Sequence, residues 1–194
     1  MTLVELTRHL VSIPSSDDET AAGDFLESWL RRETAADVRR DEVGNVIARK
    51  GSGDEPLALV GHHDVVEPAP SQVAATGAEY TVENRDGRLY GRGTADMKGA
   101  LAAALLAFRD ADPAGDLVFA SFVGEEVGGV GARHAIEQGF APTSAIVGEG
   151  STNYSGPNVT DVAVAHKGRR GSTFTAHGTA AHASEADAGE NAIY

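Results

Sequence analysis

The stretch Leu57-Ala58-Leu59-Val60-Gly61-His62-His63-Asp64 passes from four apolar residues through a glycine to three polar ones. A short apolar run of this kind is typical of a buried strand. The same design recurs twice: Leu117 to Val123 leads into Gly124-Glu125-Glu126, and Ala145 to Val147 leads into Gly148-Glu149. In open α/β sheets, sites form outside the carboxyl ends of the strands. We therefore expect these three polar groups to converge, although they lie far apart in the sequence.

Helical patterns alternate with these strands, which predicts an α/β fold with a mixed, largely parallel central sheet. Leu3, Leu6, Leu10 and Val11 recur at helical spacing, and the acidic run from Ser15 to Glu19 marks the start of a second helix. Two further segments are expected to be helical: the Ala- and Leu-rich run from Met97 to Phe108, and Val130 to Gln138 with Gly139 as its stop. The segment from Glu67 to Arg88 is expected to be an irregular loop.

The composition is strongly acidic, with 29 Asp and Glu against 16 Lys and Arg among 194 residues and a formal net charge of -13. Such a surface repels nucleic acid and anionic membranes, so neither is expected as a partner. The charge fits an ordinary acidic cytosolic protein, but it favours a protein of a high-salt cytoplasm, where salt screens the self-repulsion. The sequence shows no secretory leader and no apolar run long enough to cross a bilayer, so a cytoplasmic location is expected.

The sequence contains no cysteine, so a transition metal would have to use His, Asp and Glu. His62 followed by Asp64 suits a ligand whose ring is oriented by a carboxylate, whereas His63 would face the other way in an extended chain. Asp96 directly precedes the Ala/Leu helix, where a plain helix cap is the alternative. Glu149 alone would be an ordinary solvated loop residue.

Glu125 and Glu126 form an adjacent carboxylate pair after an apolar strand. One could bind a metal while the other moves protons, because a cation and a drier site separate their pKa values. A solvated acidic turn is the alternative. Taken together, the strand and helix ends that present His62, Asp96, the Glu pair and Glu149 predict a metal site rich in oxygen ligands. Zinc fits best, with Co²⁺ or Mn²⁺ as possible substitutes.

These residues resemble the dinuclear zinc amidohydrolases and metallopeptidases that include succinyl-diaminopimelate desuccinylase, acetylornithine deacetylase, aminoacylase and glutamate carboxypeptidase. The resemblance rests on four ordered motifs: Gly61 to Val66, Tyr90 to Gly99, Gly124-Glu125-Glu126 and Val147-Gly148-Glu149. It implies a three-layer, zinc-exopeptidase-like catalytic domain over residues 1–166 and two Zn²⁺ ions. It also implies hydrolysis of an amide bond in an N-acyl amino acid or small peptide, and a homodimeric full-length parent.

The resemblance also implies a role for each residue. His62 and Glu149 would bind one zinc, Glu126 the other, and Asp96 both, with a cis peptide bond between Asp96 and Met97. Glu125 would be the general base, which takes a proton from the attacking water and passes it to the leaving amine. Asp64 would orient His62.

The residues from 167 to 194 resemble the start of an α+β lid or dimerisation domain. There His182 would reach the partner subunit's site and help to stabilise an oxyanion, and Arg169 and Arg170 could hold a substrate carboxylate. The family's last metal ligand is a histidine with no match in this sequence. We therefore expect this chain to be the N-terminal part of a longer enzyme and to be inactive, or nearly so, by itself.

Within the family, Arg169-Arg170-Gly171-Ser172 is most like the desuccinylase branch. A deacetylase of the acetylornithine type, a hydrolase of carrier-protein-linked lysine or ornithine, a dipeptidase and a carboxypeptidase remain open. A non-catalytic metal-binding relative is the alternative from another class, and an acidic domain without a site is a third. The presence of Glu125 favours the enzyme, because a non-catalytic relative could lose its base freely.

Overall fold

The computed structural model describes residues 1–150, 159, 161–164 and 173–192. The chain forms two compact units, Met1–Thr152 and Asn153–Tyr194. The expected division into a catalytic domain over 1–166 and a lid from 167 stays a prediction.

The first unit is built on a five-stranded sheet in the order β1-β2-β6-β3-β7. Its strands are β1 (Asp37–Arg40), β2 (Val46–Lys50), β3 (Leu57–His62), β6 (Leu117–Phe122) and β7 (Ser144–Val147). β2 pairs antiparallel with β1 and β6, whereas β3 pairs parallel with β6 and β7. The predicted mixed α/β sheet is confirmed, with two of these four pairings parallel.

The register of the parallel strands brings the polar residues together. His62 lies opposite Phe122 on β6, and Val60 lies opposite Val147 on β7. The residues that follow β6 and β7 therefore leave the sheet at the same edge as the end of β3, as expected for parallel strands.

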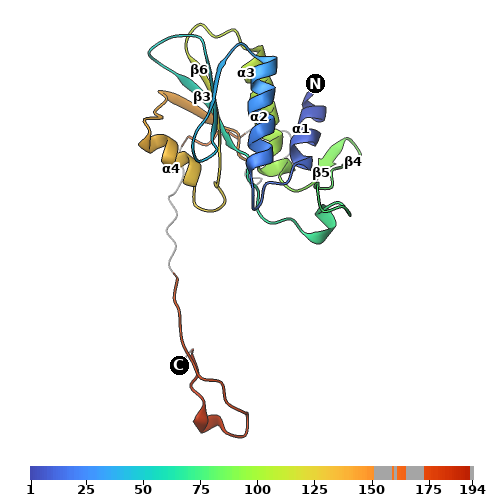
Figure 1. Ribbon diagram of the computed structural model, residues 1–194, viewed down its shortest axis with the longest axis vertical. Coiled ribbons are helices and arrows are strands. Elements are labelled where there is room, and N and C mark those ends of the chain that lie inside the picture. The colour runs from blue at the N-terminus through green and yellow to red at the C-terminus, as the bar shows by residue number, and fades with distance from the viewer. Residues whose placement is uncertain (151–158, 160, 165–172, 193–194) are drawn as a thin grey trace. The chain divides into compact units, whose positions relative to one another are not determined.

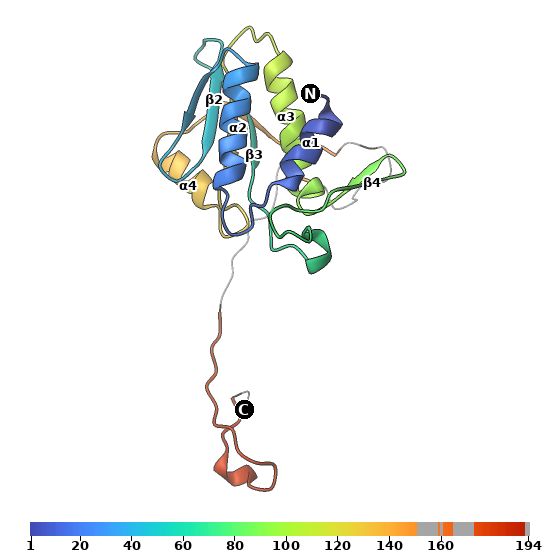
Figure 2. The same ribbon diagram turned by 45° about the vertical axis from the view of Figure 1, so that its right-hand side comes forward.

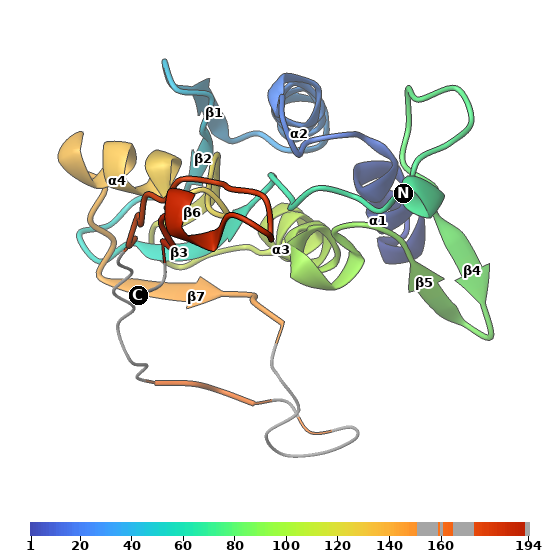
Figure 3. The same cartoon turned by 90° about the horizontal axis from the view of Figure 1, so that it is seen from below.

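Helices cover both faces of this sheet, so the unit has three layers (Figures 1 and 3). α1 (Leu3–Ser12), α2 (Thr20–Glu33) and α3 (Gly99–Asp110) lie on one side, and α4 (Val130–Glu137) lies on the other. The main core joins Leu6, Leu26 and Leu105 of the helices to Phe119 of β6. The smaller core, on the other face, joins Ala135 of α4 to Val118 and its neighbours.

The four helices form where the patterns predict them. Thr2 caps α1 through a reciprocal pair of hydrogen bonds with Glu5, and Gly139, with a φ of 90°, follows the end of α4. The Ala/Leu-rich α3 is buried on one face only, because Ala103 and Ala107 on its other face are exposed. Alanine suits an exposed helical position by its propensity, so an all-apolar pattern does not by itself report burial.

Two expectations about local structure were wrong. The segment expected to be an irregular loop contains a short 3₁₀ helix (Pro70–Gln72), and β4 (Glu83–Arg85) pairs with β5 (Arg88–Tyr90) in a hairpin beyond α1 (Figure 2). The run Ala145 to Val147 has the pattern of an interior strand, but β7 is the last strand of the sheet in the described part of the chain. Its residues are exposed, Ile146 by 57%.

In the second unit, the described residues include an isolated β-bridge between Thr179 and Glu190 and a short 3₁₀ helix over Ala186–Ala188. Within the described residues of the whole chain, no helix has the length and apolar character needed to cross a membrane.

Candidate metal centre

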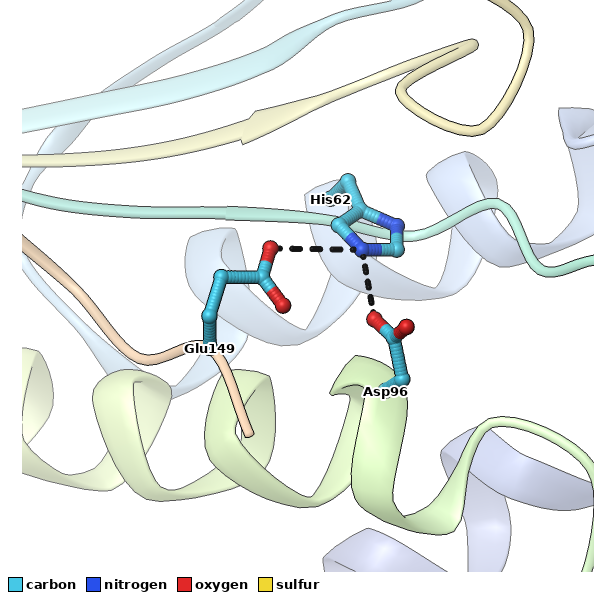
Figure 4. Close-up of side chains that lie close together, drawn as sticks. All are labelled: His62, Asp96 and Glu149. Carbon is cyan, nitrogen blue, oxygen red and sulfur yellow. Dashed lines mark hydrogen bonds and ion pairs between the residues drawn. The ribbon is translucent and has the colours of Figure 1, made fainter. Parts of the chain in front are cut away.

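His62 stands at the centre of the site (Figure 4). It ends β3, and its side chain is buried, with 2% of its surface exposed. Nε2 lies 3.1 Å from Asp96 Oδ1 and 3.5 Å from Glu149 Oε1. Asp96 comes from the turn before α3 and Glu149 from the segment after β7, so three elements meet at one imidazole nitrogen.

A second group of possible ligands shares this histidine. His62, Glu125 and Glu126 each offer an atom, and these three atoms lie within 4.8 Å of one another; the same holds for His62, Asp96 and Glu149. The structure therefore brings together all five residues that the sequence singled out as possible ligands or base.

The turn after β6 allows two adjacent carboxylates, Glu125 and Glu126, to face the same site. In an extended strand, neighbouring side chains would face opposite ways. Here Gly124 adopts a φ of 59°, which favours glycine, and its carbonyl accepts hydrogen bonds from the N–H groups of Gly129 and Val130 at 2.8 and 3.1 Å. The chain folds back within this turn, so that Glu125 and Glu126 can both approach His62.

Asp96 is presented by an unusual backbone. The Asp96–Met97 peptide bond is cis, which confirms the expectation from the resemblance. Met97 is buried, and its sulfur lies 3.3 Å from the His62 N–H. Gly61 packs against the same side chain so closely that a Cβ there would lie 2.8 Å from Met97 Cε. A glycine before His62 thus allows β3 to approach the turn that carries Asp96.

Asp64 holds the other side of the imidazole ring. Its Oδ1 lies 3.1 Å from His62 Nδ1, and its backbone carbonyl lies 3.0 Å from the same nitrogen. Burial acts to raise the pKa of Asp64, but hydrogen bonds from His62 and from the N–H groups of Glu126 and Glu125 outweigh it and lower the pKa. The carboxylate thus stays charged beside the ring.

His63 belongs to neither ligand group in the described part of the chain, in agreement with the expectation that it faces away. It is completely buried, and its Nδ1 lies 2.8 Å from Ser121 Oγ. Burial lowers the pKa of His63 to about 3, so this ring is neutral.

The pKa shifts of the site residues indicate an excess of negative charge around His62. Burial alone would lower the pKa of His62, but the carboxylates of Asp64, Glu149 and Asp96 raise it to about 9. Burial also raises the pKa of Glu126 and of Glu149, and the charge of Asp96 adds to both shifts. In the metal-free chain, the protonated His62 ring offsets part of the repulsion among the neighbouring carboxylates. A divalent cation held by the same nitrogen and oxygen donors would relieve this repulsion, so the donor set fits a metal such as zinc.

The His62 ring also borders a cavity of 260 Å³ between β3, β6, β7 and α4. Most of its lining is apolar, with Glu125 and Glu149 as the carboxylates on its wall. This cavity offers space beside the candidate ligands.

Sequence reasoning missed one carboxylate near the site. The acidic run that contains Glu19 predicts only the start of a helix, and Glu19 does precede α2. Burial raises its pKa, the charge of Asp64 adds to this, and a hydrogen bond from the Gly124 N–H opposes it. Nothing in the local sequence links Glu19 to a turn about a hundred residues away, so only the fold could reveal it.

The remaining predicted residues do not belong to the first unit. Arg169 and Arg170 lie outside the described residues. His182 belongs to the second unit, where it is exposed and its Nδ1 lies 2.8 Å from Ser184 Oγ. The substrate and oxyanion roles of these residues therefore stay predictions.

Comparison with known proteins identifies the family. The model of peptidase family M20/M25/M40 matches residues 58–192. The chain belongs to this family. A probable succinyl-diaminopimelate desuccinylase of Staphylococcus epidermidis is 34% identical over 98% of the chain and 48% of its own length. An acetylornithine deacetylase of Proteus mirabilis is 32% identical over 99% of the chain and 52% of its own length.

Solved structures agree on the fold of this M20 chain. An M20 family metallo-carboxypeptidase of Sulfolobus solfataricus superimposes with a TM-score of 0.64 and 19% sequence identity, over 76% of the chain and 37% of that structure. The chain spans about half the length of the curated relatives that it matches.

Proposed function

We propose that this M20 chain carries the metal centre of a hydrolase that cleaves an amide bond in an N-acyl amino acid or small peptide. One observation carries the proposal: His62 Nε2 faces Asp96 and Glu149 while Glu125 and Glu126 form a second group on the same imidazole. Family membership and relatives named as a desuccinylase and a deacetylase support the same reaction class.

In this proposal, two Zn²⁺ ions are the cofactors, with Co²⁺ or Mn²⁺ as substitutes. His62 and Glu149 would hold one ion, Glu126 the other, and Asp96 would contribute to both. When bound, such ions polarise a scissile carbonyl and make water more acidic.

Glu125 would act as the general base. It lies on the wall of the cavity beside His62, where a substrate carbonyl and a water molecule could approach it. Its carboxylate would take a proton from the attacking water and return it to the nitrogen of the leaving amine, so that the amide C–N bond breaks to a carboxylate and a free amine. Asp64 would keep the His62 ring in place throughout.

The names of the two curated relatives support an N-succinyl or N-acetyl amino acid as the substrate class. Arg169, Arg170 and His182 would take part in substrate binding and oxyanion stabilisation, in a homodimer of the whole protein. We also propose that the protein works in a high-salt cytoplasm, because of its net charge of -13. A dipeptidase or carboxypeptidase of the same family would use the same centre.

Glu125→Gln tests the catalytic part of this proposal. In the whole protein loaded with zinc, the variant should bind the metal as the wild type does, because Gln keeps the size of the side chain. It should release no amine from N-succinyl or N-acetyl amino acids above the uncatalysed rate. Equal amine release by the variant and the wild type would refute the role of Glu125. Absence of release by the wild type, with zinc bound, would favour a non-catalytic metal-binding protein.

A further inference from the structure

Asn45 is a completely buried amide directly before β2, and its side chain makes hydrogen bonds to three residues. Its Oδ1 accepts a hydrogen bond from the Val123 N–H at 3.0 Å. Its Nδ2 donates to the Gly131 carbonyl at 3.0 Å and to Asp41 Oδ2 at 2.7 Å. Both donors and the oxygen of this amide are thus used.

These partners allow only one orientation of the amide. If the group were turned by 180°, its oxygen would face the oxygen atoms of Asp41 and Gly131, and its NH₂ would face the Val123 N–H. Asp41 in turn is fixed by the turn between β1 and β2, where its Oδ1 accepts from the N–H groups of Val43, Gly44 and Asn45 at 3.2, 3.0 and 2.9 Å. The hydrogen bond to Asp41 therefore fixes the position of the Asn45 side chain.

Val123 and Gly131 flank the turn that carries Glu125 and Glu126. The Gly131 N–H donates to the Val123 carbonyl at 2.9 Å, which closes the neck of this turn. Asn45 bonds the other polar group of each residue, so it ties both ends of the turn to β2. The approach is so close that a Cβ on Gly131 would lie 2.2 Å from Asn45 Oδ1.

We propose that Asn45 is a positioning residue for the metal centre: by joining Val123 to Gly131, it holds the Gly124–Val130 turn in the form that directs Glu125 and Glu126 toward His62. Asn45 contacts neither ligand group itself, and it acts through the backbone of the turn. The consequence for metal binding rests on the proposed function, whereas the effect on the turn does not.

A purely structural role is the alternative. A buried, hydrogen-bonded amide contributes to stability wherever it lies, and its loss leaves unpaired backbone groups that destabilise the whole fold. Such a role would weaken the unit as a whole. The positioning role makes a different prediction. At equal loss of stability, a change at Asn45 should loosen the turn and lower the metal affinity more than a change at another buried site does.

The test compares Asn45→Ala and Asn45→Asp with Val38→Ala, a substitution of a buried residue on the neighbouring strand β1. Asp keeps the shape of Asn and the acceptor for Val123, but it loses the donors to Gly131 and Asp41 and places a second carboxyl group beside Asp41. It is the second variant, which is used if the Ala variant does not fold. All variants are studied in the full chain, and unfolding temperatures serve to match their stability. Amide hydrogen exchange and the binding of Co²⁺, followed by its visible absorption, are then measured.

We expect both Asn45 variants to exchange the amides of Val123 and of the 124–131 turn faster than Val38→Ala does, relative to the amides of α3. We expect their Co²⁺ affinity to fall by about ten-fold or more, as for other groups behind metal ligands. Exchange and Co²⁺ affinity equal to those of Val38→Ala at matched stability would overturn the inference. If no protein, wild type included, binds Co²⁺, the proposed function fails, and the exchange of the turn still decides the role of Asn45.

Discussion

The Asp64 carboxylate lies 3.1 Å from Nδ1 of His62. Its other oxygen accepts a hydrogen bond from the Glu126 N–H at 3.0 Å. The buried Asp64 side chain thus contacts the His62 ring, and it also binds the turn that carries Glu125 and Glu126. Asp64 therefore links the two groups of candidate ligands through the Nδ1 side of the His62 ring and the backbone of Glu126.

Asp64→Asn should weaken zinc binding by about ten-fold to a hundred-fold. The amide removes the negative charge beside the His62 ring. Its NH₂ group also faces one of two N–H donors, either that of the His62 ring or that of the Glu126 backbone. Titration calorimetry of the full chain measures this change. Asp54→Asn, on an exposed loop, is the matched control and should bind as the wild type does. Equal affinities for Asp64→Asn and Asp54→Asn would contradict the role given to Asp64.

Zinc binding should release a proton from His62. The pKa of His62 is raised to about 9 in the metal-free chain, so the ring is protonated at pH 7, whereas a metal ligand must be neutral. The affinity should therefore rise with pH up to about 9. Titration calorimetry at pH 7 in buffers of different ionisation enthalpy should show that this ring releases about one proton per chain when its ion binds. Metal binding without proton release at pH 7 would show that His62 is not a ligand.

His63 should make the metal-free chain sensitive to acid. Its pKa is about 3 in the folded chain against a usual 6.5, so between these values the unfolded chain binds a proton that the folded chain does not. Stability is thus lost as the pH falls from 6.5 toward 3. Urea unfolding at several pH values should give a shallower slope for His63→Gln than for the wild type. The same slope in both proteins would show that the buried ring does not control this loss.

Salt should stabilise the fold. With a net charge of -13, the acidic side chains repel one another at low ionic strength, and added salt screens that repulsion. Refolding yield and unfolding temperature should both be higher in multimolar KCl than in dilute buffer. Equal stability under the two conditions would remove the halophilic interpretation.

The sequence predicted the parts of the site that depend on local patterns. Apolar runs mark β3 and β6, the polar residues come after each strand end, and parallel pairing then brings His62 and Glu125 to one edge of the sheet. The proximity of Glu149 to His62 follows from the same logic, because β7 pairs parallel with β3. Asp96 stands in the turn before α3, so parallel pairing does not account for its position. The resemblance supplied the cis bond at Asp96, which no composition or periodicity could indicate.

The features that the sequence did not predict depend on contacts between distant segments. Asn45 contacts residues that lie 78 and 86 positions further along the chain, and its local pattern is only that of a strand start. The exposure of Ile146 escaped prediction for a related reason, because an apolar run reports its own chemistry and not whether a neighbouring strand covers it.

The most direct test of the central claim is a zinc titration of the wild-type chain, of His62→Ala, and of His134→Ala as the control. His134 lies in α4 and belongs to neither ligand group among the described residues. We predict that the wild type and His134→Ala bind the same number of zinc ions with equal affinity, and that His62→Ala loses the ion that the His62 ring and Glu149 would hold. Equal zinc binding by all three proteins would contradict the assignment of this site as the metal centre.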